Sequence, residues 1–117
     1  MLEGRVVNMV TPTGTLPPSI DEIQSRLAPF CRQHGVARLE VFGSLARGES
    51  RPGSDVDLLI TFQPDVHPGW DFFDLHKEIE AILGCKVDLL TRRSVEHDEN
   101  AIRRRSILQS TCEIFAA

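Results

Sequence analysis

The segment Asp55-Val-Asp-Leu-Leu-Ile-Thr-Phe62 constrains the fold more than any other part of this chain. It begins with two carboxylates one residue apart and continues as an apolar run, which is typical of a strand at the centre of a sheet. Side chains two apart on a strand leave the same face. Two acids on one face of a buried strand repel each other and lose hydration, unless a divalent cation lies between them. The segment therefore predicts a central strand whose beginning forms a polar site.

The rest of the chain fits one domain around that strand. A length of 117 residues suits a single hydrophobic core, and the hydrophobic fraction of 41% is ordinary for a folded protein. Pro12, Gly14, Pro17 and Pro18 interrupt any periodic pattern near the start. We therefore predict a flexible leader over residues 1–18 and a single domain over residues 19–117.

Helical and strand patterns alternate along this domain. Ser19 and Glu22 form a capping-box pattern at the start of a helix, and Gly84 is a suitable helix end. The expected elements are a helix from residue 19 to just before Gly35, a strand over 37–42, a short helical turn from Gly43, a strand over 55–62, a helix over 72–83, a strand over 86–90, a helix over 101–109 and a short closing strand over 112–115. This order predicts an α+β (α/β) fold with helices packed on a small mixed sheet.

Asp88 repeats the pattern of an acid inside an apolar strand, within Val87-Asp88-Leu89-Leu90. A neighbouring strand would bring it beside Asp55 and Asp57. Three carboxylates suit phosphoryl transfer with two Mg²⁺ or Mn²⁺ ions, so we predict all three acids as metal ligands and catalytic residues. Asp88 is the candidate general base.

Gly43 and Ser44 supply the complementary half of this site. A glycine at a strand end lets backbone amides approach a phosphate, and the serine hydroxyl can donate to it. Arg47 or Arg51 would neutralise departing pyrophosphate, and Ser54 joins Gly43, Ser44 and Arg47 as a nucleotide-binding candidate. A Gly-Ser pair alone is usually a turn, and Asp-x-Asp alone is usually a solvated strand edge. Their joint spacing, Gly-Ser-x10-Asp-x-Asp, favours nucleotidyl transfer.

Charge and apolar patterning exclude several other classes of protein. The net charge of −4 opposes a protein that binds nucleic acid mainly through phosphate contacts, and the run Arg103–Arg105 follows three acids as a solvated helix face would. The apolar runs are strand-sized, so we predict a cytoplasmic protein without membrane contact. Three unpaired cysteines indicate reduced thiols.

The stretch Val-Phe-Gly-Ser-Leu-Ala-Arg-Gly-Glu-Ser-Arg-Pro-Gly-Ser-Asp-Val-Asp-Leu-Leu, residues 41–59, resembles the signature of minimal nucleotidyltransferases of the DNA polymerase beta superfamily. The likeness continues through Lys86-Val-Asp-Leu-Leu-Thr91 and covers residues 20–115. It implies phosphate contact at Gly43 and Ser44, metal binding at Asp55 and Asp57, and a third catalytic carboxylate at Asp88. Leu45 departs from the pattern, because many relatives have arginine there.

Many members of this family are antitoxins paired with a HEPN-domain ribonuclease toxin. The resemblance implies that the chain transfers AMP from ATP to a hydroxyl of that toxin, with tyrosine as the expected acceptor, and so neutralises it within a hetero-oligomer. The sequence contains no tyrosine, which excludes its own modification on tyrosine. Two alternatives stay open: a binding module that masks the toxin without catalysis, and a subunit that nucleotidylates a small molecule such as an antibiotic. Trp70 is a candidate partner contact.

Overall fold

The computed structural model describes residues 17–117, so the leader predicted over residues 1–18 lies almost entirely outside the described part. The predicted helices and strands are confirmed to within one or two residues at their ends, and one short helix that was not predicted follows the third strand. In chain order the elements are α2 (Ile20–Gln33), β1 (Val36–Phe42), α3 (Gly43–Ala46), β2 (Val56–Phe62), α4 (Asp71–Leu83), β3 (Val87–Thr91), α5 (Arg92–Glu96), α6 (Ala101–Leu108) and β4 (Cys112–Ala116).

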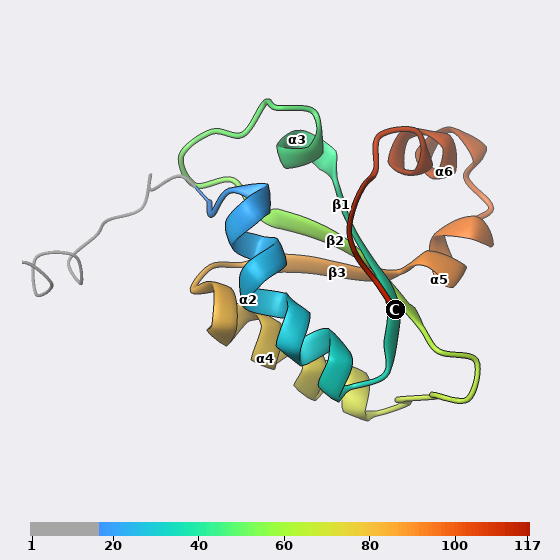
Figure 1. The fold of residues 1–117 in the computed structure, drawn as a ribbon. Helices are drawn as coiled ribbons and strands as arrows, with labels where there is room; N and C mark the ends of the chain where they lie inside the picture. The colour runs from blue at the N-terminus through green and yellow to red at the C-terminus, as the bar shows by residue number, and fades with distance from the viewer. Residues whose placement is uncertain (1–16) are drawn as a thin grey trace, which may run out of the picture.

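The four strands form one mixed sheet in the order β3-β2-β1-β4. β1 is antiparallel to both β2 and β4, whereas β2 and β3 are parallel. A parallel pair needs a crossover connection, and α4 provides it (Figure 1). The expectation of an α+β fold with helices on a small mixed sheet is confirmed.

One face of the sheet carries the main core, which α2 and α4 cover (Figure 1). The helix α2 begins at the predicted capping box, in which Ser19 Oγ accepts from the Glu22 amide and Glu22 Oε1 accepts from the Ser19 amide. Alternate strand residues point into this core. The fully buried side chains include Ile23, Leu27, Leu39, Val41, Leu58, Ile60 and Ile79.

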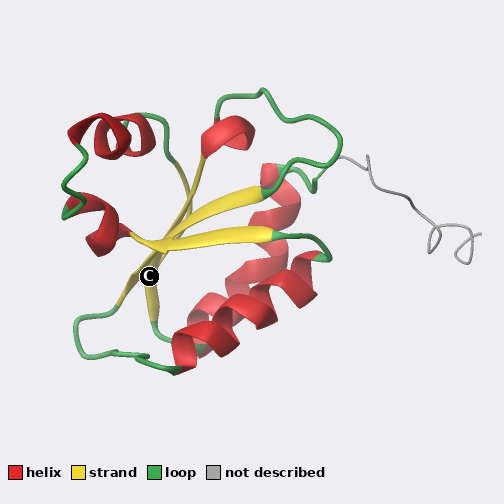
Figure 2. Ribbon diagram, turned by 180° about the vertical axis from the view of Figure 1, so that it is seen from behind, coloured by secondary structure: helices red, strands yellow, loops and turns green. Residues whose placement is uncertain are grey.

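The opposite face is covered over part of its length by α5 and α6. A second apolar cluster there contains Phe42, Leu59 and Val95, with partly buried side chains of α6 packed against it. Figure 2 shows α5 and α6 beside the strands, while no described helix crosses the beginnings of β2 and β3 on this face. The second face is therefore packed at one end and open at the other.

Glu40 is the one charged side chain that is buried among residues 17–117, with 4% of its surface exposed. It lies on β1, and Arg92 Nη1 of α5 donates to both of its oxygens, at 2.8 and 2.9 Å. Burial alone would lower the pKa of Arg92, but its hydrogen bonds to Glu40 and Glu96 and their charges raise it above its ordinary value. The pair holds α5 against the central strand without leaving an uncompensated charge.

The three cysteines are free thiols, as expected. Cys31 is buried in the main core, and that burial raises the pKa of its thiol to about 12. Among the residues that the structure describes, no helix is long and apolar enough to cross a membrane. A cytoplasmic location stays a prediction.

We predict that Arg92→Met destabilises the protein by about 3 kcal/mol, because Glu40 is left buried without its partner. Chemical denaturation followed by circular dichroism measures this loss. Arg38→Met is the matched control: Arg38 pairs with Glu113 at 3.1 Å, but both side chains are nearly half exposed, so the loss should stay below about 1 kcal/mol. The double variant Glu40→Leu/Arg92→Met should recover most of the stability, and equal losses in the two single variants would contradict the assignment.

Candidate functional site

The ends of three adjacent strands meet at the open part of the second face. Gly43 directly follows β1, Asp57 is the second residue of β2, and Asp88 is the second residue of β3. The register pairs Phe42 with Asp57 and Asp57 with Asp88. Neighbouring strands lie about 4.8 Å apart, so the two acids are lateral neighbours on one face. The expectation that Asp88 arrives on a strand beside Asp57 is confirmed.

Gly43 and Asp57 are in direct contact. Gly43 has a φ of +74°, in the left-handed region that favours glycine. A Cβ built on Gly43 would collide with Oδ2 of Asp57. A residue with a side chain is therefore disfavoured here both by the positive φ and by this collision. The turn at Gly43 and the beginning of β2 are therefore packed against each other.

Asp57 is held in an electrostatically unfavourable place. Burial raises the pKa of its carboxyl from 3.8 to about 6, the negative charges of Asp88 and Asp55 add to the rise, and the positive charge of Arg47 opposes it. Asp55 and Asp88 are exposed, whereas Asp57 is half-buried. Asp55 also departs from the expected strand, because it immediately precedes β2 and belongs to the loop.

Within residues 17–117, no group of three or more His, Cys, Asp or Glu side chains is arranged to hold a metal ion. The three acids therefore lie at the same end of strands β2 and β3, but they do not form a ligand cluster. Their oxygen donors have the chemistry that Mg²⁺ and Mn²⁺ prefer, and burial of Asp57, followed by the negative charges of Asp88 and Asp55, raises the pKa of its carboxyl. The metal assignment of Asp55, Asp57 and Asp88 stays a prediction.

The other predicted nucleotide contacts lie in α3 and the loop after it. Ser44 stands in the first turn of α3, whose amides have no acceptor within the helix, and Arg47 Nε pairs with Glu49 Oε1 at 3.0 Å. Ser54 Oγ accepts from the Arg51 amide at 3.0 Å, so this hydroxyl is used in closing the loop. Leu45 packs against the main core, which explains why an apolar side chain suits that position.

The beginning of β3 is fixed by α4. β3 is an edge strand of the described sheet, and its Val87 amide donates to Glu80 Oε2 at 3.0 Å while His76 Nε2 donates to the Val87 carbonyl at 2.7 Å. These two bonds hold the residue that immediately precedes Asp88. Sequence reasoning did not identify His76 and Glu80, because only the packing of α4 against the sheet edge reveals their contact with β3.

A cavity of about 400 Å³ lies beside this site, between Arg47 and α6. Its lining includes Arg105, Ser106 and Gln109 of α6. From the sequence, Arg105 was interpreted only as part of a solvated helix face, and Ser106 and Gln109 were not identified, because only the folded chain brings α6 close to Arg47. The cavity adds a second arginine to the surroundings of the predicted nucleotide contacts.

Comparison with known families and curated proteins agrees with this geometry. The sequence model of the nucleotidyltransferase domain family matches residues 25–111. A protein of Methanocaldococcus jannaschii, named as a candidate protein adenylyltransferase, is 39% identical over 77 residues, which cover 66% of this chain and 82% of that protein. The protein adenylyltransferase MntA of Thermococcus cleftensis is 35% identical over 82 residues, covering 67% of this chain and 82% of that protein.

Solved structures show the same fold. The structure of a candidate minimal nucleotidyltransferase is 30% identical and has a TM-score of 0.62, covering 81% of this chain and 95% of that one. A chain in the complex of a tri-AMPylated Shewanella oneidensis HEPN toxin with MNT antitoxin has a TM-score of 0.59 at 14% identity, covering 84% of this chain and 73% of that one. The second likeness concerns the fold alone.

We predict that Gly43→Ala lowers the free energy of unfolding by about 1–3 kcal/mol more than Gly48→Ala does. Both glycines have a positive φ, +74° and +72°, but nothing lies within 4 Å of a Cβ on Gly48. The backbone penalty is therefore matched, and the difference isolates the collision with Asp57. Urea denaturation of both variants measures it; equal losses would show that the two residues do not constrain each other.

We predict that Asp57→Asn stabilises the protein in metal-free buffer, and only above about pH 4. Below its unfolded pKa of 3.8, Asp57 is protonated in both states. Between 3.8 and about 6, the folded state keeps a proton that the unfolded state has lost, so the wild type loses stability relative to the variant as pH rises.

Above about pH 6 the gain from Asp57→Asn should level off at about 2 kcal/mol, allowing for partial exposure of the carboxyl. Denaturation curves at a series of pH values test this. Asp65→Asn, at an exposed position in the loop after β2, is the control that should leave the pH profile unchanged. A pH-independent difference between wild type and Asp57→Asn would refute the electrostatic origin.

Proposed function

This chain belongs to the nucleotidyltransferase domain family, and we propose that it is a protein adenylyltransferase that transfers AMP from ATP to a hydroxyl of a HEPN-domain toxin and thereby neutralises the toxin. One observation carries the proposal: the fold brings Gly43, Asp57 and Asp88 together in a chain that is 35% identical to a protein adenylyltransferase. We expect the acceptor to be a tyrosine of the partner.

The proposed reaction is one substitution at the α-phosphorus of ATP. The acceptor oxygen forms a bond to that phosphorus, the bond to the oxygen bridging the α- and β-phosphates breaks, and pyrophosphate leaves. The acceptor proton passes to Asp88, which we assign as general base because it is exposed beside Asp57 and can reach a hydroxyl presented from outside. The products are pyrophosphate and a partner protein that carries AMP.

The remaining predicted residues have distinct parts in this proposal. The amides in the first turn of α3 and the Ser44 hydroxyl would bind phosphate oxygens. Arg47 would turn from Glu49 toward the departing pyrophosphate, with Ser54 holding the loop between α3 and β2. Asp55, Asp57 and Asp88 would hold Mg²⁺ or Mn²⁺, with two ions expected, which when bound would offset the charge of the triphosphate.

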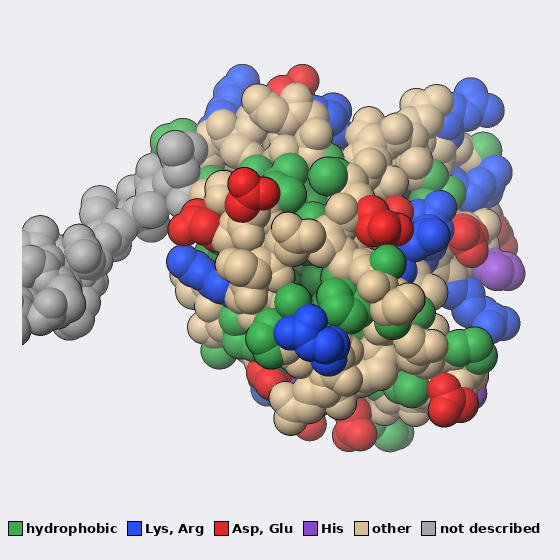
Figure 3. Space-filling view, in the orientation of Figure 1, with side chains coloured by type: hydrophobic (Ala, Val, Ile, Leu, Met, Phe, Trp, Pro, Cys, Tyr) green, Lys and Arg blue, Asp and Glu red, His purple; other side chains and the backbone are tan. Residues whose placement is uncertain are grey.

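A partner protein must present the acceptor, because the described residues form one sheet with its helices and contain no second domain. Lys and Arg side chains gather over α5 and α6 on the side of the molecule shown at the right of Figure 3. The segment from Arg92 to Arg105 contains five arginines and three acids, a net positive charge in a chain of net charge −4. This local charge supports docking of an acidic protein surface and a hetero-oligomeric complex.

Masking of the toxin without catalysis is the second candidate function. One observation favours it: Leu45, at the position where many relatives have arginine, is a partly buried apolar side chain packed against the main core. In that case the nucleotide site would be vestigial, and protection of the partner would not depend on Asp57 or Asp88.

The transfer experiment combines the chain, Mg²⁺, ATP labelled at the α-phosphate and a purified HEPN-domain protein as the candidate partner. We predict label on the partner and none with ATP labelled at the γ-phosphate. Asp57→Asn and Asp88→Asn should each reduce transfer by at least about 10³-fold, and a chelator should abolish it. Lys77→Gln, a substitution on α4 away from these acids, is the control that should keep full activity.

Three outcomes distinguish the alternatives. Loss of label after Tyr→Phe substitutions in the partner would support tyrosine as the acceptor. If the Asp55→Asn/Asp57→Asn variant transfers no label and still neutralises the partner fully, masking is the function instead. Label that appears in a small molecule and not in the protein would support the reading of this chain as an antibiotic-type nucleotidyltransferase subunit.

A further inference from the structure

A cavity of about 480 Å³ lies at the carboxyl ends of β2 and β3, away from the acids. Asp57 is at the beginning of β2 and Thr61 near its end, which places the cavity about 13 Å farther along the strand. Its walls come from the end of β2, the loop before α4, Phe72 of α4, Thr91 at the end of β3 and Arg93 of α5. None of the residues assigned to nucleotidyl transfer lines it.

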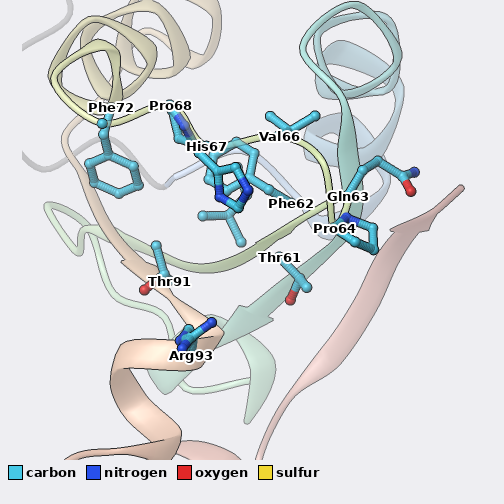
Figure 4. A pocket seen from close by; sticks show the side chains of 12 residues that line it. Thr61, Phe62, Gln63, Pro64, Val66, His67, Pro68, Phe72, Thr91 and Arg93 are labelled. Atoms are coloured by element: carbon cyan, nitrogen blue, oxygen red, sulfur yellow. The ribbon is translucent and has the colours of Figure 1, made fainter.

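The cavity has an apolar side and a polar side (Figure 4). Phe62, Val66 and Phe72 lie on one side together with His67 and Pro68, whereas Thr61, Thr91 and Arg93 lie along the other. A volume in the range of ordinary ligand sites, with mostly apolar walls and a few polar groups, is typical of a small-molecule pocket. The position also fits, because open sheets with parallel strands bind ligands outside the carboxyl ends of those strands.

Two of the polar groups have no partner among residues 17–117. The buried Oγ1 of Thr61 makes no hydrogen bond there, although buried polar atoms are paired in nearly all folded proteins. The Arg93 guanidinium forms no ion pair within the described part of the chain, in contrast to Arg92, which is fixed by Glu40. Thr91 is already used, since its Oγ1 accepts from the Ser94 amide at 3.1 Å.

We propose that this pocket binds a small organic carboxylate with an aromatic or branched apolar body. The carboxylate would lie between Arg93 and Thr61, accepting hydrogen bonds from both, and the apolar body would cover Phe62 and Phe72. An uncharged apolar ligand would leave Arg93 unpaired, and a wholly polar anion would leave the aromatic wall uncovered. A nucleoside triphosphate does not fit, because Arg93 is the one Lys or Arg side chain in the lining and would leave most of the triphosphate charge unpaired.

Phenylacetate is a suitable probe for the whole chain, with two analogues that each lack one half of its chemistry. Acetate has the charge without the ring, and 2-phenylethanol has the ring without the charge. We expect phenylacetate to produce saturable amide shifts in ¹H–¹⁵N NMR spectra at residues 60–72 and 91–93. Both analogues should bind at least about tenfold more weakly.

Variants locate the carboxylate. Arg93→Gln should weaken phenylacetate binding about tenfold or more, and Thr61→Val, which keeps the shape of the side chain, should weaken it severalfold. Arg103→Gln is the control, because it removes another exposed arginine that lies outside the lining and should leave the affinity unchanged. Transfer activity should persist in Thr61→Val, since Thr61 is assigned neither to the transfer reaction nor to the arginines proposed to dock the partner.

Several results would overturn the proposal. These are shifts that do not saturate, shifts centred on Gly43 and Asp57, equal affinity for 2-phenylethanol, or unchanged affinity in a folded Arg93→Gln protein. Each is independent of whether the chain adenylylates a partner, so failure of this inference and failure of the proposed function are distinguishable.

Discussion

Asp57 lies opposite Asp88 because β2 and β3 run parallel and in register, and the polar site depends on that pairing. A slip of one residue would turn Asp88 toward the face covered by α2 and α4, where its charge would be buried. The crossover helix that a parallel pair requires also fixes the register here, since His76 and Glu80 of α4 bind the backbone of Val87. The same helix therefore joins the two strands and positions the residue next to the third acid.

Glu40 is buried and Asp57 is half-buried, and the two acids differ in how their charge is compensated. Glu40 is neutralised from within by Arg92, whose two hydrogen bonds satisfy its oxygens and attach α5 to the sheet. Within residues 17–117, Asp57 receives no such partner; it packs against Gly43 and faces the charges of Asp55 and Asp88. Folded proteins tend to keep such an arrangement where it serves a function, because a simpler residue would be more stable. The contrast distinguishes the acid that maintains the fold from the acid that we propose as a ligand-binding residue.

Much of the fold could be predicted from the sequence, because its helices and strands are marked by local signals. The capping box at Ser19, the alternation in β1 and the glycine after α4 each report on their own neighbourhood. The five-residue helix α5 has no apolar period and begins after Thr91, a residue that also ends a strand, so no local pattern identified it. The strand order was equally inaccessible, since it depends on contacts between segments far apart in the chain.

For the candidate site, the spacing of Gly43, Ser44, Asp55 and Asp57 predicted which residues gather at one edge. It did not predict that Gly43 touches Asp57, that Asp55 precedes the strand, or that the acids stop short of a ligand cluster. Those facts depend on side-chain directions that only the assembled sheet fixes. The pocket at Arg93 and Thr61 had no sequence signal, because its lining comes from the ends of two strands, a loop and two helices.

Trp70 gives this protein an unusual optical property. It is the one tryptophan in a chain without tyrosine, it is 86% exposed, and it stacks on Phe73 with ring centroids 6.4 Å apart. Its emission is therefore expected to resemble that of a solvated indole in both the folded and the unfolded state. Intrinsic fluorescence will be a poor monitor of unfolding, but a sensitive local probe of anything that covers the beginning of α4, next to Gly69 at the rim of the pocket.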